Sequence, residues 1–171
     1  MSSHQMITVS DHGFDPALLR QAFGLFPSGV TAFCGMIAGA PEGMTASSFA
    51  SVSLDPPLVS VGVANTSTTW PKLAALPTLG LSVLSSGHGT VARRLSARGV
   101  DRFAEVDWVE TEAGAVFVHG AALWLECKPF KTVDAGDHEI VVLAIEALLM
   151  NPDVDPMIFH RSGFHEILRS A

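Results

Sequence analysis

Apolar residues in this chain alternate with small and polar residues in many short runs, a pattern typical of β-strands. The strands expected from these runs cover residues 30–37, 44–53, 58–63, 79–84, 115–118, 121–128, 138–146, 157–160 and 164–168. Helical periodicity predicts helices at 16–26, from Thr69 and at 90–95. Many short strands, few helices and no internal repeat favour a mainly β fold, a split antiparallel β-barrel with a few short peripheral helices.

Turn signals divide these segments. Asp15-Pro16 is a good N-cap and first-turn pair for the first helix. Turns are expected at Pro27-Ser28-Gly29, at residues 40–43 and at Asp55-Pro56-Pro57. His119-Gly120 is compatible with a hairpin turn between the segments 115–118 and 121–128.

The composition indicates one domain with a covered surface. A length of 171 residues fits a single domain, which we expect over residues 15–171, after a mobile N-terminal tail at residues 1–14. Hydrophobic residues make up 48% and charged residues only 16%, against about 25% charged residues in typical domains. We therefore expect part of the surface to be covered by a second subunit, as in a homodimer.

Charge and cysteine content exclude several classes of function. The formal net charge of −7 argues against nucleic acid or an anionic membrane as a partner. Cys34 and Cys127 have no Cys-x-x-Cys or metal-like spacing, so no metal site is expected, and they suit the reducing cytoplasm. No Gly-x-Gly-x-x-Gly opens a helix, which gives no indication of a Rossmann dinucleotide site.

A cluster of hydroxyl side chains is the clearest chemical feature. Between Gly43 and Leu58, five hydroxyl residues fall within nine positions, namely Thr45, Ser47, Ser48, Ser51 and Ser53. Hydroxyls and free backbone N–H groups hold a phosphate or a polar heterocycle without a large opposing charge. Any single residue of the cluster is equally well explained as bonding local backbone, whereas the cluster as a whole favours a binding site.

Four segments in the same order carry a family resemblance. The segment 43–59, Gly-Met-Thr-Ala-Ser-Ser-Phe-Ala-Ser-Val-Ser-Leu-Asp-Pro-Pro-Leu-Val, resembles the signature of the flavin reductase family with the FMN-binding split-barrel fold. The other three segments are residues 20–30, Gly136-Asp137-His138 and residues 157–161. This resemblance implies a homodimeric NAD(P)H:flavin oxidoreductase that uses FMN or FAD, with NADH or NADPH as the hydride donor.

The resemblance also implies roles for particular residues. The flavin ring and ribityl chain are expected to contact Thr45, Ala46, Ser47, Ser48 and Phe49, with Ser53 at the edge. The ribityl or phosphate part is expected to contact Asn65, Ser67 and Thr68. Of the bases that could meet the phosphate (Lys72, Arg93, Arg94 and Arg102), Arg94 is the candidate chosen, although a solvated helix face also explains these charges.

His138 is the candidate catalytic residue. The histidine of this motif lies beside the nicotinamide in the family, so the resemblance implies that His138 orients the carboxamide and helps to place the hydride donor. From the residues alone, Asp137 and His138 are better explained as capping a turn. Leu143 and Ala144 depart from the glycine and acidic residue usual in the family, and Pro129 stands where a β-branched residue is common.

The sequence therefore predicts a flavin reductase that supplies reduced FMN or FAD to a partner monooxygenase. Two alternatives remain at this point. One is a reductase that keeps its flavin and reduces another acceptor, such as a metal chelate or a corrin. The other is a flavin-binding carrier without turnover.

Overall fold

The computed structural model describes residues 7–8 and 15–168. Most of the expected tail, residues 1–14, lies outside the described residues, so that expectation stays a prediction. The helices are α1 (Pro16–Phe23), α2 (Trp70–Ala74) and α3 (Gly89–Ser96), with a 3₁₀ turn η1 (Ser86–His88). The strands are β1 (Ser28–Gly29), β2 (Thr31–Ile37), β3 (Ala40–Ala46), β4 (Ala50–Leu54), β5 (Pro57–Ala64), β6 (Leu79–Val83), β7 (Trp108–Glu110), β8 (Val116–Val118), β9 (Leu123–Ala135), β10 (His138–Met150), β11 (Ile158–His160) and β12 (Gly163–His165).

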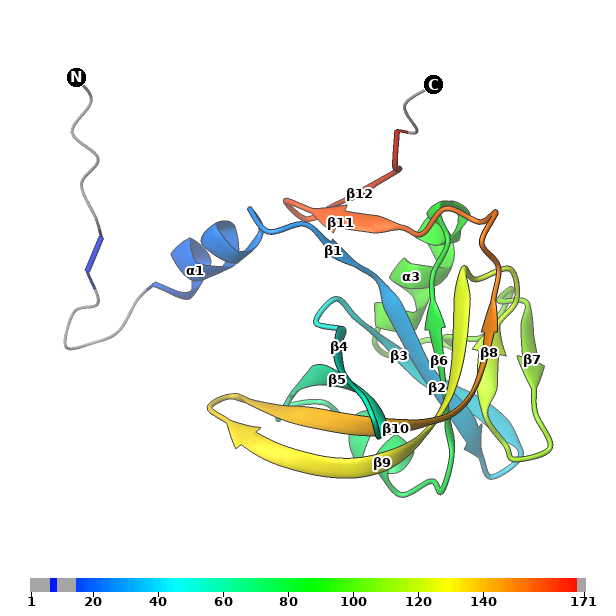
Figure 1. The fold of residues 1–171 in the computed structure, drawn as a ribbon. Helices are drawn as coiled ribbons and strands as arrows, with labels where there is room; N and C mark the ends of the chain where they lie inside the picture. Colours follow the sequence, from blue (N-terminus) through cyan, green and yellow to red (C-terminus); the bar gives the residue numbers. More distant parts are fainter. Residues whose placement is uncertain (1–6, 9–14, 169–171) are drawn as a thin grey trace.

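The strands form antiparallel sheets, which confirms the expected mainly β split barrel. A seven-stranded sheet has the order β3-β2-β6-β9-β10-β5-β4, and two smaller sheets have the orders β1-β11-β12 and β7-β8. The long β9–β10 hairpin curves along one side of the barrel, while α1 projects away from it beside the β1-β11-β12 sheet (Figure 1). The short helices α2 and α3 lie on the periphery of the strands.

Strand β2 separates two clusters of buried side chains. Residues Thr31–Gly35 of this strand are all buried. Because successive side chains of a strand point to opposite faces, Phe33 packs into one cluster and Ala32 and Cys34 pack into the other. The first cluster also contains Leu73 of α2, and the second contains Leu95 of α3. Each helix therefore covers one side of the sheet with its apolar face.

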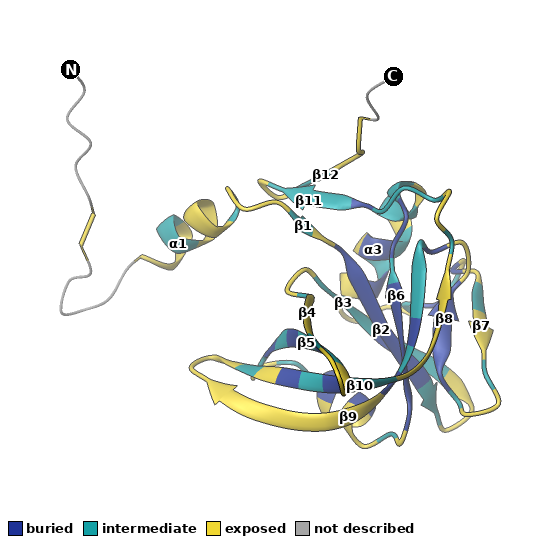
Figure 2. Cartoon of the chain, viewed as in Figure 1, coloured by how far each residue is buried: buried dark blue, intermediate teal, exposed yellow. Residues whose placement is uncertain are grey.

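Burial decreases along the β9–β10 hairpin. The first residues of β9 alternate between buried and half-buried, whereas its last eight residues are exposed (Figure 2). Pro129 lies opposite Leu143 and Lys131 lies opposite Val142, so Phe130 is an extra residue in β9. This bulge falls next to Pro129, which has no N–H to donate to the ladder.

Several expected boundaries were wrong by a few residues. The first helix ends at Phe23 instead of Phe26, because Leu25 and Phe26 already form turn hydrogen bonds to Ala22 and Phe23. The expected strand 44–53 is two strands, with β3 ending at Ala46 and β4 beginning at Ala50. The expected turn at 40–43 belongs to β3, and the turn before it lies at Ala38 and Gly39, which both have positive φ.

One expected pairing was also wrong. The segments 115–118 and 121–128 were expected to pair as a hairpin, but β8 pairs with β7, which the sequence pattern did not indicate. Strand β9 pairs instead with β6 and β10. The indole Nε1 of Trp124 still donates a hydrogen bond of 2.9 Å to the carbonyl of Val118, so the two segments remain neighbours.

Gly80 marks the closest approach between the main sheet and β8. A Cβ atom at this position would lie 2.1 Å from the carbonyl oxygen of Val116 and 2.7 Å from its carbonyl carbon. Both are backbone atoms, which cannot rotate away as a flexible side chain can. Only glycine therefore allows β6 and β8 to pack at this separation.

We expect Gly80→Ala to lower the free energy of unfolding by about 3 kcal/mol, the cost typical of overpacking a well-packed core. Urea denaturation followed by circular dichroism measures this change. Gly87→Ala is the matched control, because a Cβ at Gly87 meets nothing within 4 Å. Equal stability of the two variants would show that β8 is free to move away from Gly80.

Candidate functional site

The hydroxyl cluster lies at a bend between the end of β3 and the start of β4. The hydroxyl of Thr31 donates a hydrogen bond of 3.0 Å to the carbonyl of Ala46, where β3 ends. The hydroxyl of Ser48 accepts from the N–H of Gly62 and donates to the carbonyl of the same residue, both at 2.9 Å. Part of the cluster therefore fixes the bend on β2 and β5, as the structural explanation of single residues anticipated.

Thr45 has a different environment, because its side chain meets the C-terminal end of α3. The hydroxyl oxygens of Thr45 and Ser96 are 2.5 Å apart. Ser96 donates its hydrogen to the carbonyl of Ala92 at 2.7 Å, so Thr45 is the donor in the pair with Ser96. The two residues lie between two adjoining hollows, and both line each of them.

The first hollow, which we call the loop pocket, has a volume of about 210 Å³. Its walls come from β3, from the loop after β5 and from the end of α3. The lining residues are Met44, Thr45, Ala64, Thr66, Ser67, Thr68, Thr69, Leu95, Ser96, Arg98 and Arg102. The second hollow, of about 250 Å³, is lined by Val30, Thr45, Ala46, Ser47, Ala92, Ser96, Phe159 and Phe164.

The loop after β5 is held at its two ends and is free in its middle. Its first residue, Asn65, donates from Nδ2 to the carbonyl of Gly136 at 3.1 Å and from its backbone N–H to the carbonyl of Asp137 at 3.0 Å. Toward α2, the hydroxyl of Ser67 accepts from the N–H of Trp70 at 3.0 Å. Within the described part of the chain, Thr66 and Thr68 make no hydrogen bond, so their exposed hydroxyl and N–H groups are available to a ligand.

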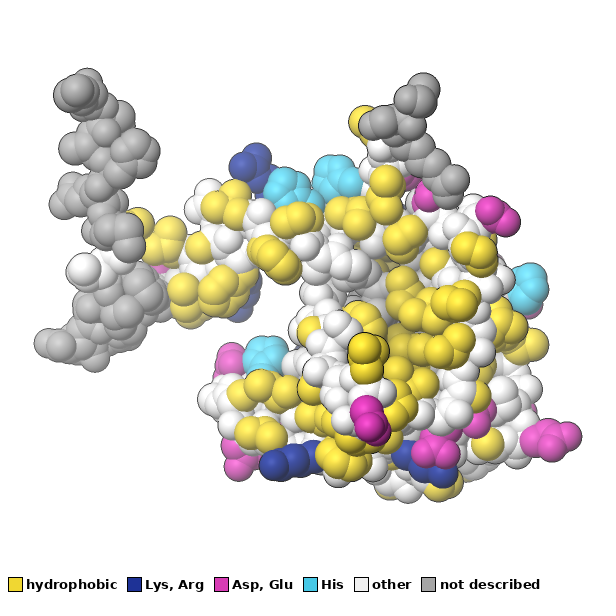
Figure 3. Space-filling view, viewed as in Figure 1, with side chains coloured by type: hydrophobic (Ala, Val, Ile, Leu, Met, Phe, Trp, Pro, Cys, Tyr) yellow, Lys and Arg dark blue, Asp and Glu magenta, His cyan; other side chains and the backbone are white. Residues whose placement is uncertain are grey.

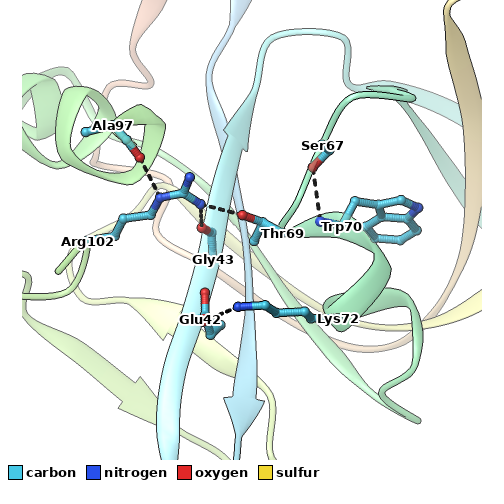
Figure 4. A network of polar contacts seen from close by, with 8 residues as sticks. All are labelled: Glu42, Gly43, Ser67, Thr69, Trp70, Lys72, Ala97 and Arg102. Carbon is cyan, nitrogen blue, oxygen red and sulfur yellow. Dashed lines mark hydrogen bonds and ion pairs between the residues drawn. The ribbon is translucent and has the colours of Figure 1, made fainter. Parts of the chain in front are cut away.

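Arg102 joins this loop to β3 and to α3 (Figure 4). Its Nε donates to the carbonyl of Ala97 at 2.7 Å, and its Nη1 donates to the carbonyl of Gly43 at 2.8 Å and to the hydroxyl of Thr69 at 2.7 Å. Nη2 has no partner among the described residues. Every buried side-chain nitrogen or oxygen atom of these residues does have a partner, so Nη2 is not buried. Because Arg102 lines the loop pocket, this exposed group is a candidate donor to an anion there.

The candidate Arg94 and the neighbouring Arg98 differ from Arg102 in their surroundings. The guanidinium of Arg94 donates to the carbonyl of Ala104 and forms an ion pair of 2.8 Å with Glu105, and Arg94 does not line either hollow. Arg98 is exposed, lines the loop pocket and forms no ion pair with any described residue. Among these arginines, Arg98 and Arg102 are the ones placed to meet an anion in the loop pocket.

His138 is the first residue of β10 and lies opposite Ala64 at the end of β5. Its Nδ1 is 2.7 Å from Oδ1 of Asp137, and its side chain is 48% exposed. The hydrogen bond and the charge of His138 lower the pKa of the Asp137 carboxyl. An ionised carboxylate only accepts, so Nδ1 carries the hydrogen, and a neutral His138 presents Nε2 as an acceptor.

The structure brings together some of the expected site residues and separates others. Thr45, Ser67 and Thr68 line the loop pocket, and Thr45, Ala46 and Ser47 line the second hollow. Asn65 is bonded to the turn that carries His138. The remaining expected residues line neither hollow. Ser48 bonds Gly62, and Phe49 packs against the first core cluster. Ser53 lies in β4 beyond a bulge, and Arg94 bonds the loop at residues 104–105.

Sequence reasoning missed Thr66, Ser96 and Arg98 and considered Arg102 without choosing it. A signal for Thr66 was present, because it stands between Asn65 and Ser67 in a run of polar residues. No local pattern distinguishes Arg102 from Arg94, since the difference arises from the path of the chain after α3. Among the described residues, no three histidine, cysteine or acidic side chains gather as a metal site would require, and no helix there is long and apolar enough to cross a membrane.

The split barrel and its hydroxyl-rich pocket offer a cradle for a cofactor, and a flavin bound there would itself supply redox chemistry. The family model described as "Flavin reductase like domain" matches residues 23–168. The chain therefore belongs to the flavin reductase-like family.

Proteins named as reductases are among those similar to this chain. The chain is 39% identical over 163 residues to the NADH-dependent FAD reductase of Streptomyces globisporus, covering 92% of this chain and 88% of that protein. It is 40% identical over 135 residues to the stachydrine N-demethylase reductase subunit Stc3 of Rhizobium meliloti, covering 78% of this chain and 59% of that protein. The solved structure of the Streptomyces globisporus NADH:FAD oxidoreductase SgcE6 with NAD and FAD fragments has a TM-score of 0.88 at 37% identity, covering 97% of this chain and 99% of that chain.

We expect Ser48→Ala to lower the free energy of unfolding by about 1 kcal/mol, because it leaves both the N–H and the carbonyl of Gly62 without their partner. Ser47→Ala removes a hydroxyl from the same bend that makes no described hydrogen bond and serves as the control. Thermal and urea unfolding of the two variants, measured without flavin, compares them. If both variants are as stable as the unsubstituted protein, Ser48 does not fix the bend.

Proposed function

We propose that this protein reduces free flavin with a nicotinamide nucleotide and releases the reduced flavin to a partner monooxygenase. The observation that carries the proposal is the loop pocket, which is lined by the unpaired Thr66 and Thr68 together with Arg102, whose Nη2 has no partner among the described residues. These groups fit the phosphate of a flavin nucleotide, because they supply N–H, O–H and guanidinium donors together. The similarity to an NADH-dependent FAD reductase and to a reductase subunit, both named above, supports the same activity.

In this proposal the flavin phosphate lies in the loop pocket and the ring lies toward Thr45, Ala46 and Ser47. The flavin, when bound, supplies the redox chemistry. The chain supplies positioning: the bend is fixed by Ser48, and the hydroxyl and amide groups of the loop after β5 hold the phosphate. Arg98 and Arg102 take the role that the sequence pattern had suggested for Arg94.

His138 is proposed to position the hydride donor. The carboxylate of Asp137 fixes the hydrogen on Nδ1, and Nε2 then accepts a hydrogen bond from the carboxamide N–H₂ of nicotinamide. Since Asn65 bonds both Gly136 and Asp137, the turn carrying this histidine is tied to the loop that lines the phosphate pocket. In this proposal, the connection keeps the donor and the flavin at a defined separation.

The test of the activity is the rate of NADH and NADPH oxidation as free FMN or FAD is titrated into the purified protein. A saturable dependence on added flavin supports the reductase. A yellow protein whose rate ignores added flavin indicates the tight-flavin alternative. Flavin binding without nucleotide oxidation indicates the carrier.

We expect His138→Ala to raise the KM for NADH about tenfold while the Kd for flavin changes less than twofold, because one hydrogen bond to the nucleotide is lost. His119→Ala is the control, since His119 is also exposed and also pairs with an aspartate, Asp107, at 3.3 Å. Initial rates and flavin fluorescence titrations measure the two constants. A loss of flavin binding in His138→Ala would assign His138 to the fold of the turn instead.

We also propose that two copies of this chain form a homodimer in the cytoplasm. Helix α1 has no buried residue, and Phe23, Leu25 and Phe26 at its end are 71%, 57% and 77% exposed. Hydrophobic side chains gather over this arm and over the face of the barrel seen in Figure 3. Leu148, Leu149 and Met150 at the end of β10 are also exposed. Apolar surface of this extent is characteristic of an interface, and the two free, buried cysteines suit a reducing compartment.

We expect the double variant Phe23→Asp with Phe26→Asp to sediment as a monomer where the unsubstituted chain sediments as a dimer, because two charges would be buried without partners. Analytical ultracentrifugation at several concentrations measures the association. Glu139→Lys on β10 changes charge outside this apolar arm and serves as the control. A monomeric unsubstituted chain would contradict the proposal directly.

A further inference from the structure

A further hollow lies where α1 meets the sheet β1-β11-β12, and we call it the arm pocket (Figure 1). Its volume is about 540 Å³, and it is lined by Arg20, Gln21, Gly24, Leu25, Arg161 and Ser162. None of these residues lines the loop pocket or the second hollow. The proposed flavin site therefore does not account for the arm pocket.

The arm pocket is lined by two arginines and by no carboxylate. Arg20 lies in the last turn of α1, and Arg161 lies in the turn between β11 and β12. The segments 16–30 and 157–165, which supply the two sides of the pocket, contain no aspartate or glutamate. Among the described residues, neither arginine side chain forms an ion pair or a hydrogen bond. In a chain whose formal net charge is −7, the two arginines make this hollow a local positive site.

The residues of the turn between β11 and β12 are not those that its backbone selects. His160 pairs with Gly163, so the hairpin has a two-residue loop made of Arg161 and Ser162, with φ values of 49° and 62°. Hairpin turns with two positive φ values favour Asn-Gly, because a side chain is crowded in this region. Residues held in sparsely populated backbone regions cluster at functional sites. Arginine and serine here supply a guanidinium and a hydroxyl, which an Asn-Gly turn lacks.

Backbone hydrogen bonds join the two sides of the pocket. The N–H of Arg161 donates to the carbonyl of Gly24 at 3.0 Å. The carbonyl of Arg20 accepts from the N–H of Gly24 at 2.9 Å. The carbonyl of Ala22 accepts from the N–H of Leu25 at 3.1 Å. These bonds engage carbonyl groups at the C-terminal end of α1, whose partial negative charge would otherwise oppose an anion.

We propose that the arm pocket binds a phosphate group, either free phosphate or the end of a small phosphate monoester. The guanidinium groups of Arg20 and Arg161 match the two charges of the dianion, and each can donate two parallel hydrogen bonds to it. A carboxylate carries one charge and leaves one of the guanidinium groups unmatched. The hydroxyl of Ser162 and the amide of Gln21 add neutral donors.

The bound phosphate holds α1 and the turn between β11 and β12 together, in addition to the hydrogen bond between Arg161 and Gly24. The site is separate from the proposed flavin site and fills without flavin. Its failure would leave the proposed function untouched.

Calorimetric titration with inorganic phosphate tests the proposal, at constant ionic strength and about pH 8, where a phosphate group is a dianion. The unsubstituted protein is expected to bind phosphate with a Kd of about 1 mM or tighter. The double variant Arg20→Gln with Arg161→Asn is expected to raise this Kd at least tenfold and to change the Kd for flavin less than twofold. Asparagine tolerates positive φ, so it removes the guanidinium and keeps the turn.

Arg98→Gln is the matched control, because Arg98 is also exposed and unpaired among the described residues but lines the loop pocket. It is expected to change the Kd for phosphate in the arm pocket less than twofold. Loss of phosphate binding in Arg98→Gln, with binding kept in the double variant, would place phosphate in the loop pocket alone and overturn the proposal. Thermal unfolding in chloride buffer checks that the double variant is as stable as the unsubstituted protein.

A second titration with glycerol 3-phosphate separates the two sources of the phosphate group. A lower Kd than that of inorganic phosphate supports a phosphate monoester as the ligand, and an equal Kd supports free phosphate. No phosphate binding by the unsubstituted protein overturns the proposal. If the double variant then also sediments as a monomer, the two arginines pair with carboxylates of a second copy instead.

Discussion

The burial of β2 on both faces is the constraint on which the remaining structure depends. A strand with apolar neighbours on either side needs a sheet partner along each edge, which β3 and β6 provide, and needs helices or further strands above and below. It also needs small residues where the layers approach, and Ala32, Cys34 and Gly35 supply them. The two core clusters, and the positions of α2 and α3 over them, follow from this strand.

The site forms where this packed structure leaves polar groups uncommitted. Ser48, Ser67 and Thr69 use their hydroxyls to fix a bend, the start of a helix and an arginine, and so give the pocket its shape. Thr66 and Thr68, with no such bonds in the described structure, give it binding capacity. In the run 66–69, chemically similar residues thus divide into supporting groups and proposed binding groups, according to which donors and acceptors lie within reach.

Much of the fold could be predicted from the sequence because local patterns determine it. The strands at 58–63, 79–84 and 138–146 and the helix at 90–95 appear within a few residues of their expected bounds, except that β10 continues to Met150. The pairing of β8 with β7 could not be predicted, since strand partners depend on contacts distant in sequence. The same holds for the site: the hydroxyl cluster was visible, but the role of Arg102 depends on three segments meeting around one guanidinium.

The pair formed by Thr45 and Ser96 makes one part of the pocket wall a hydrogen-bond acceptor. The hydrogen of Ser96 is directed to Ala92 and that of Thr45 to Ser96, so both hydroxyls turn lone pairs toward any further neighbour. At this point the wall accepts and does not donate. This pair offers no hydrogen to a carbonyl or phosphate oxygen, whereas it can accept from groups that carry hydrogen, such as the hydroxyls of a sugar alcohol chain. In the proposed binding mode, a ligand with a phosphate at one end and hydroxyls along its length would therefore set its hydroxyls, and not its phosphate, against this pair.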